Sequence, residues 1–237
     1  MKIVDLSHNV RTGMTQRFAG PIPSIFDLDL RVGKEYEAID DCCVLQNHLG
    51  THIDAPRHYN PRHGMAVHEV PLERLITPAV VLNLTHKERL SSITVEDLQA
   101  ALKAAQEDIR PNDAVLLHTG MAAHYDTWDS ERWEESEYAK YPSISEGAVR
   151  WLLSKQIALI GVDTLAPDRS KDSRPTHQIL LRDNNIPIIE NLCNLDRLTK
   201  SRVLFIALPP KIVGASGFLV RAVAIEDFDG AAVIGRR

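Results

Sequence analysis

The chain has 237 residues, of which 44% are hydrophobic and 25% are charged, and its formal net charge is −5. This length can bury a sizeable core, and the composition is that of an ordinary soluble globular protein. There is no basic excess that would attract nucleic acid. No apolar run approaches the roughly 18 residues needed to cross a bilayer. We therefore expect neither a nucleic-acid partner nor a membrane partner.

The N-terminal residues and the cysteines bear on the cellular compartment. The opening MKIVDLSHNV has neither the apolar h-region nor the small-residue cleavage site of a signal peptide. The three cysteines, Cys42, Cys43 and Cys193, make no disulfide framework and are interpreted as buried thiols. No activating arrangement can be read around Cys193, so we expect a core residue there rather than a nucleophile. These features predict a cytoplasmic protein.

Short β-rich runs recur along the chain and predict a strand-rich fold. Several are continuously apolar, such as AVVLNL and IALIGV, which indicates strands covered on both faces. No repeat, low-complexity tract or polar linker separates them, so residues 1–237 are expected to form a single domain. The expected strands are residues 2–6, 42–47, 79–84, 114–118, 157–162, 186–189, 203–208 and 220–225.

Helical patterns alternate with these strands and make the predicted class α/β. Thr94 begins a T-x-x-D capping pattern followed by an apolar stripe. Ser145 caps a second expected helix, and a third is expected over residues 175–182. The spacing is too irregular for a simple βαβ repeat. Residues 125–141, rich in Trp, Glu and Tyr, are interpreted as a surface excursion: a lid, an oligomer contact or a solvated helix.

The segment HLGTHIDAPRH at residues 48–58 concentrates three imidazoles and one carboxylate. Because side chains alternate along a strand, His48, His52 and Asp54 are expected on one side. On a straight strand the two histidines would lie roughly 13 Å apart. A shared metal therefore requires a bend, which Gly50 can supply. These ligand types suit zinc, manganese or iron(II).

The end of this motif predicts a turn. Pro56 is expected to stop the strand, so that the chain brings His58 back toward the same space. A helix carrying His48 and His52 as i, i+4 neighbours is the rival geometry. Gly50 and Pro56 argue against that helix.

A second group of polar residues lies later in the chain. Residues 161–168, GVDTLAPD, are expected to begin as a strand and end in a loop, a common place for active-site groups. His177 lies on the expected short helix, where a structural role is the common alternative. Glu190 closes an apolar strand, and an unpaired buried carboxylate is costly. A metal ion and a salt bridge to Arg or Lys are equal alternatives for Glu190.

The remaining histidines are weaker candidates. His8 follows the first strand, where it could approach the site or make a loop hydrogen bond, and His63 and His68 are expected to be exposed. The sequence contains no P-loop, dinucleotide-binding fingerprint, G-x-S-x-G elbow or C-x-x-C pair.

The pattern H-x-G-T-H-x-D-x-P-x-H resembles the signature of the cyclase family of metal-dependent hydrolases. Bacterial kynurenine formamidase and isatin hydrolase belong to that family. The resemblance implies the family's swivelling β/β/α fold, assembled as a homodimer or homotetramer. Six further blocks resemble the family in order: IVDLSH, LLHTG at 116–120, SISEGAVRWL, GVDT at 161–164, IIENLCNLDRL at 188–198 and ALPPKIVGASGFLVRAVAI at 207–225.

The resemblance also implies residue roles. In formamidase-like members, Asp54 would bridge two zinc ions and His58 would be the proton-transfer catalyst. Zinc, two ions per chain, is the first candidate, and manganese is the alternative. The implied metal ligands are His48, His52, Asp54, His177 and Glu190.

Two departures from the formamidase-like pattern concern the substrate pocket. Residues 16–21 read QRFAGP, which lacks the Pro-Gly-Asp of those members, and Phe18 is the candidate aromatic, substrate-binding residue. Met121 follows a glycine where tryptophan is frequent. The ligand set is therefore complete, whereas the pocket wall differs.

The resulting hypothesis is hydrolysis of a C–N amide bond, other than a peptide bond, in a small-molecule substrate. A metal-bound hydroxide would attack the carbonyl, and His58 would accept the proton and pass it to the leaving nitrogen. The enzymatic alternative is isatin hydrolase-like opening of a cyclic amide or lactone with a single manganese. The non-enzymatic alternative is an inactive, metal-stabilised binding protein.

Overall fold

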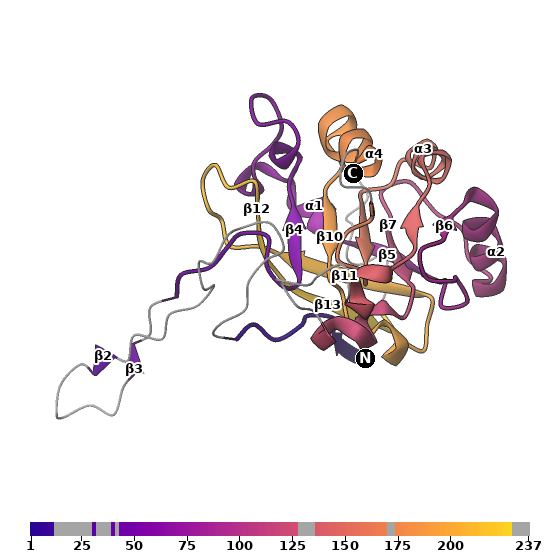
Figure 1. Cartoon of the computed structure of the whole chain (residues 1–237), viewed down its shortest axis with the longest axis horizontal. Coiled ribbons are helices and arrows are strands. Elements are labelled where there is room, and N and C mark those ends of the chain that lie inside the picture. Colours follow the sequence, from indigo (N-terminus) through magenta and orange to yellow (C-terminus); the bar gives the residue numbers. More distant parts are fainter. Residues whose placement is uncertain (12–29, 32–38, 41–42, 128–135, 170–173, 229–237) are drawn as a thin grey trace.

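The computed structural model describes residues 1–11, 30–31, 39–40, 43–127, 136–169 and 174–228. Its centre is a nine-stranded mixed sheet in the order β1-β13-β11-β5-β7-β9-β10-β4-β12 (Figure 1). The strands are, in sheet order, β1 Lys2–Asp5, β13 Arg221–Glu226, β11 Arg202–Leu208, β5 Ile76–Asn83, β7 Ala114–His118, β9 Leu159–Val162, β10 Ile188–Glu190, β4 His52–Asp54 and β12 Gly217–Leu219. Two short pairs lie outside it: β2 Leu30–Arg31 with β3 Ile39–Asp40, and β6 Ser92–Ile93 with β8 Ser143–Ile144.

Strand direction divides the sheet into three zones. The four central strands β5, β7, β9 and β10 are parallel, whereas the three strands at one end and the two at the other pair antiparallel. The parallel strands are connected through α2 Val95–Ala105, α3 Glu146–Ser154 and α4 Pro175–His177. The α4 turn continues as the π-helical segment η5 Gln178–Asp183.

Each face of the sheet carries its own apolar core, because successive side chains point to opposite sides. Val80 and Val115 pack with α2, α3 and η5, whereas Val81 and Leu116 pack on the opposite face with β11 and β13. Figure 1 shows β11 and β13 running across the direction of β4 and β10, so the sheet curls around this second core. The helix α1 Leu72–Leu75 contributes Leu75 to it.

The structure confirms the α/β class and most of the expected elements. Seven of the eight predicted runs correspond to strands β1, β5, β7, β9, β10, β11 and β13, with ends shifted by up to three residues. Thr94 and Asp97 form the predicted capping box of α2. Ser145 Oγ accepts the Ala148 amide at the start of α3. Both caps could be predicted because they depend on a few adjacent residues.

Three expectations were wrong. Residues 43–47 are coil and turn, because no described strand pairs with them and β propensity needs a partner. Cys43 is exposed, contrary to the expected burial, whereas Cys193 is buried, as expected. The segment 125–141 is no surface excursion at its C-terminal end, where Tyr138 and Tyr141 are fully buried.

Within the described residues, no helix is long and apolar enough to span a membrane.

Candidate metal centre

Strand register brings one imidazole and two carboxylates, those of His52, Asp54 and Glu190, to one face of the sheet. Glu190 of β10 lies directly opposite His52 of β4, and Ile188 lies opposite Asp54. Opposed residues in an antiparallel pair point to the same side, as do residues two apart in one strand. His52 Nε2 consequently lies 3.3 Å from Asp54 Oδ1 and 3.4 Å from Glu190 Oε2.

Bends on either side of β4 bring in the other two histidines of the motif. Gly50 adopts a left-handed φ of +55° between His48 and the strand, as the sequence predicted. This turn leaves His48 Nδ1 2.6 Å from Asp54 Oδ1. After the strand, the 3₁₀ turn η1 Pro56–His58 reverses the chain, and His58 Nε2 lies 3.8 Å from Asp54 Oδ2.

His177 closes the centre from the helical layer. It ends α4, and its Nε2 lies 3.4 Å from Asp54 Oδ2 and 3.3 Å from Glu190 Oε1. The helix is anchored by Asp168, whose carboxylate accepts hydrogen bonds from the Thr176 amide, the His177 amide and His177 Nδ1. The structure thus brings together all five predicted ligands and His58.

The centre is buried, and burial shapes its protonation. Asp54, His52 and His177 are each 1% exposed and Glu190 is 5% exposed. Burial alone would raise the pKa of Asp54, but the surrounding histidines hold that pKa well below its usual range. For His177 burial opposes protonation, yet the hydrogen bond to Asp168 and the nearby carboxylates of Asp54 and Glu190 raise its pKa well above the ordinary value. At His58 burial dominates and lowers the pKa to about 4.

Three of the four imidazoles have one nitrogen held from outside the centre. His48 Nε2 lies 3.2 Å from Ser216 Oγ, His52 Nδ1 donates to the Gly50 carbonyl at 2.8 Å, and His177 Nδ1 contacts Asp168 at 2.5 Å. In each ring the other nitrogen faces a carboxylate of the centre. Such outer partners fix the tautomer and orientation of metal-binding histidines. His58 makes no ring hydrogen bond to any described residue.

The donor set fits a divalent metal. His52 Nε2 and Glu190 Oε1 are buried and have no hydrogen-bond partner within the described structure. Buried polar atoms of this kind are costly unless an ion or another group satisfies them. Among the described residues, two groups have ligand atoms within 4.8 Å of one another: His48, Asp54 and His58, and His52, Asp54 and Glu190. Imidazole and carboxylate ligands are those that zinc and manganese accept. In the part of the chain that the structure describes, the ion pairs of Glu190 are with His52 and His177 and not with an Arg or Lys, which favours the metal alternative.

Sequence reasoning missed the residues that hold these ligands. Asp168 stood in a loop singled out as a place for active-site groups, but nothing local linked it to His177. Ser216 and Gly217 approach His48 only because β12 pairs with β4. A Cβ on Gly217 would lie 2.6 Å from His48 Cε1, so only glycine leaves room for the ring. Phe18, the predicted aromatic residue, lies outside the described residues.

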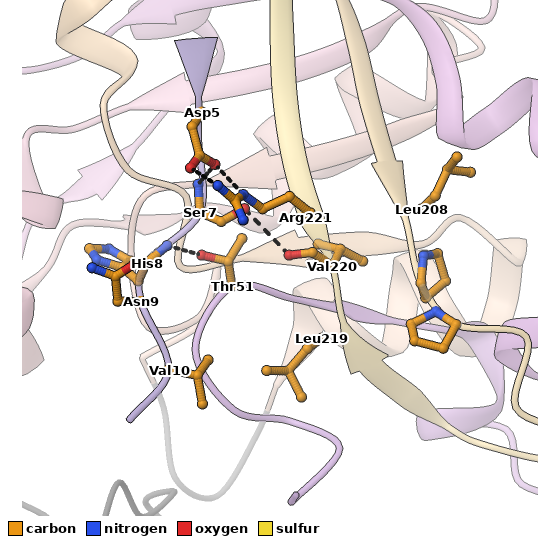
Figure 2. Close-up of a pocket in the computed structure, with 12 residues that line it drawn as sticks. Asp5, Ser7, His8, Asn9, Val10, Thr51, Leu208, Leu219, Val220 and Arg221 are labelled. Atoms are coloured by element: carbon orange, nitrogen blue, oxygen red, sulfur yellow. Dashed lines mark hydrogen bonds and ion pairs between the residues drawn. The ribbon is translucent and has the colours of Figure 1, made fainter. Parts of the chain in front are cut away.

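The weaker histidine candidates lie away from the centre. His8 donates its backbone amide to Thr51 Oγ1 and lines a pocket of about 460 Å³ that contains none of the six central residues (Figure 2). Its ring stacks on Tyr125 with ring centroids 3.6 Å apart. His63 is exposed, as expected, whereas His68 is half-buried and accepts the Gly214 amide.

Comparison with known proteins gives the family. The Cyclase family model, described as "Putative cyclase", matches residues 4–169. A kynurenine formamidase of Paracidovorax citrulli (strain AAC00-1) is 29% identical over 220 residues, which cover 92% of this chain and 94% of that protein. The crystal structure of an isatin hydrolase bound to the product analogue thioisatinate aligns with a TM-score of 0.79 and 25% identity, covering 94% of this chain and 91% of that one. A "predicted metal-dependent hydrolase" from Bacillus stearothermophilus aligns with a TM-score of 0.72 and 28% identity, covering 94% and 97%. The chain therefore belongs to the cyclase family, as its histidine motif predicted.

Proposed function

We propose that the protein is a metal-dependent hydrolase that cleaves a C–N amide bond, other than a peptide bond, in a small-molecule substrate. The observation that carries this proposal is the buried pair of unpartnered atoms, His52 Nε2 and Glu190 Oε1, beside Asp54. Buried side-chain polar atoms usually have a hydrogen-bond partner, and these two lie within a group of side chains whose ligand atoms could hold a metal ion. The kynurenine formamidase of Paracidovorax citrulli supports the same chemistry by its similarity.

The proposed ligands are His48, His52, Asp54, His177 and Glu190, with Asp54 at the middle of the set. Asp54 is the natural shared ligand, because its two oxygens face different histidines: Oδ1 faces His48 and His52, whereas Oδ2 faces His177. When bound, a divalent cation lowers the pKa of water from 15.7 toward roughly 7 and polarises a carbonyl oxygen.

His58 is the proposed proton carrier. Its Nε2 lies 3.8 Å from Asp54 Oδ2, beside the proposed ligands, where a neutral imidazole can accept a proton from the attacking water. The side chain is 32% exposed, far more than the other ring beside Asp54 Oδ2, that of His177. Exposure and the lack of a described ring hydrogen bond allow it to release the proton to a leaving nitrogen. An amine is a poor leaving group, so this second transfer is needed.

The first test separates proton transfer from metal binding. We expect His58→Ala to retain its metal content and to lose about 10²–10⁴-fold in turnover, the usual contribution of general acid–base catalysis. Metal analysis and hydrolysis of a panel of aryl formamides and cyclic amides check both results. Loss of metal together with full activity after metal addition would contradict the assigned role.

The number of metals separates the two enzymatic candidates. We expect two zinc equivalents per chain and the loss of one in Glu190→Gln, because Glu190 faces both His52 and His177. The second candidate is isatin hydrolase-like opening of a cyclic amide or lactone, which the TM-score of 0.79 to an isatin hydrolase structure favours. One manganese equivalent in the wild type and activity on cyclic substrates alone would select it. A metal-loaded protein inactive on the whole panel would instead indicate a binding protein.

Assembly and compartment belong to the same proposal. We expect a homodimer or homotetramer in the cytoplasm, and light scattering of the purified protein tests the oligomeric state.

A further inference from the structure

Two buried residues outside the metal-ligand set connect directly to His52. The Tyr138 hydroxyl donates to Asn191 Oδ1 at 2.7 Å, and Asn191 Nδ2 donates to the Gly50 carbonyl at 2.9 Å. The same carbonyl accepts from His52 Nδ1 at 2.8 Å. Tyr138 is fully buried and Asn191 is 3% exposed, so water does not compete for these bonds. The four residues form one chain of hydrogen bonds, the Tyr138–Asn191–Gly50–His52 relay.

The chemistry of the Gly50 carbonyl determines the direction of every bond in the relay. A carbonyl oxygen only accepts, so both Asn191 Nδ2 and His52 Nδ1 must donate to it. The Asn191 amide is thereby fixed with Oδ1 toward Tyr138, whose hydroxyl must donate. His52 is fixed with hydrogen on Nδ1, and its Nε2 carries the lone pair toward Asp54 and Glu190 when the ring is neutral.

The backbone of Asn191 links the same relay to the ends of two strands. Asn191 directly follows Glu190 and has a left-handed φ of +56°, a conformation that asparagine tolerates well. Its amide donates to the Thr164 carbonyl at 3.0 Å, and its carbonyl accepts from Thr51 Oγ1 at 2.5 Å. One residue therefore holds the end of β10 beside Glu190 and the start of β4 beside His52.

We propose that Asn191 and Tyr138 are positioning residues of the metal centre, which select the nitrogen that His52 presents and hold His52 against Glu190. This inference rests on the proposed function only in taking His52 and Glu190 as metal ligands. It assigns a function to part of the segment 125–141, which supplies Tyr138 to the core.

Asn191→Asp is the direct variant, with Asn194→Asp as its matched control. An aspartate at 191 keeps the left-handed backbone and an acceptor for Tyr138 but sets an oxygen against the Gly50 carbonyl. Asn194 has the same φ of +56°, and its Nδ2 donates to the Asp5 carbonyl at 2.8 Å, away from the centre. Tyr138→Phe removes only the hydroxyl and adds no charge.

Zinc affinity, measured by competition with a chromophoric chelator, is the first readout. We expect Asn191→Asp to weaken zinc binding about 10–100-fold, the range observed when partners of metal-binding histidines are changed. Tyr138→Phe should weaken it less, by about threefold, and Asn194→Asp should match the wild type. Equal weakening in Asn194→Asp, or wild-type affinity in Asn191→Asp, would overturn the proposal.

The second readout is the ¹H–¹⁵N NMR signal of His52 Nδ1–H in the zinc-loaded protein. A slowly exchanging signal is expected in the wild type, and faster exchange in Tyr138→Phe. An unchanged signal and affinity in Tyr138→Phe would refute the relay even if Asn191→Asp does not fold. If the wild type binds no zinc, the proposed function fails, whereas the same signal still tests the relay in metal-free protein.

Discussion

At the residue scale, the described centre contains two kinds of histidine. His48, His52 and His177 each have a nitrogen held by an outer partner, whereas His58 makes no ring hydrogen bond to a described residue. Fixed rings suit ligands, and an unconstrained ring suits a group that must accept and release a proton. The residue pattern singled out His48, His52 and His58, and the family resemblance implied His177 as a ligand and His58 as the proton carrier. The outer partners Ser216 and Asp168 could not be predicted, because they reach the rings only through tertiary contacts.

The carboxylate of Asp168 should affect metal binding although it lies behind His177. Asp168→Asn removes the charge that accepts three hydrogen bonds and orients this ring, so we expect zinc affinity to fall about 10–100-fold. Asp113→Asn is the control, because Asp113 is also buried but pairs with Arg202 far along the sheet. Chelator competition measures both, and an equal loss in the control would reject an orienting role.

His8 should make the fold sensitive to mild acid. Burial lowers its pKa to about 4 from the ordinary 6.5. Between these values the unfolded chain binds a proton that the folded chain does not, so stability falls as the pH drops through this window. We expect His8→Phe, which keeps a ring against Tyr125, to lose less stability than the wild type between pH 7 and pH 5.

Urea unfolding of the metal-free proteins at the two pH values measures the difference. Identical losses in His8→Phe and the wild type would show that other groups carry the acid sensitivity.

At the element scale, the sequence predicts where helices begin better than it predicts which segments pair as strands. The first residues of α2 and α3 could be predicted from the N-cap residues Thr94 and Ser145, whose side chains accept hydrogen bonds from amides three residues further along the chain. Strand β12 Gly217–Leu219 has no such signal, because it is a strand only by pairing with β4. Conversely, residues 43–47 have β propensity and no described partner. Propensity alone therefore overpredicts one strand and misses another.

Gly217 tests how closely β12 must approach β4. In Gly217→Ala the added Cβ would lie 2.5 Å from the Ile53 carbonyl oxygen and 2.6 Å from His48 Cε1, so the strand or the ring must move. We expect a loss of about 1–3 kcal/mol in stability and weaker zinc binding. Gly147→Ala in α3, where nothing lies within 4 Å, should instead be neutral or stabilising. Unfolding curves and chelator competition measure the two effects, and unchanged zinc affinity in Gly217→Ala would separate β12 from the centre.

At the scale of the whole molecule, the centre joins parts of the chain that no local pattern relates. The motif at 48–58 predicts its own bend and turn, because Gly50 and Pro56 act on adjacent residues. His177 and Glu190 reach Asp54 only after the crossover through α4 folds over the sheet. Physical reasoning left both residues with open alternatives for this reason, and only the family resemblance joined them to the motif.

A metal held by all these segments should stabilise the entire fold. At a metal concentration about 1,000 times the dissociation constant, binding adds about 4 kcal/mol. Since 1 kcal/mol shifts the melting temperature of a domain this size by about 2–4 °C, chelation should lower it by roughly 8–16 °C. Thermal unfolding with EDTA, and again after zinc is restored, measures the change. A melting temperature that is the same with EDTA and after zinc is restored would contradict a shared metal centre.

The pairing of Glu190 with His52 also constrains how this chain can change in length. Inserting one residue within β10 would place Ile189 opposite His52, and deleting one would place Asn191 there. Either change turns the Glu190 carboxylate to the opposite face, since strand side chains alternate. No point substitution could restore the lost ligand at that position except another carboxylate. Insertions and deletions should therefore abolish the chemistry within β4 and β10 and in the segments that carry His48, His58 and His177, and be tolerated in connections that carry none of the central residues.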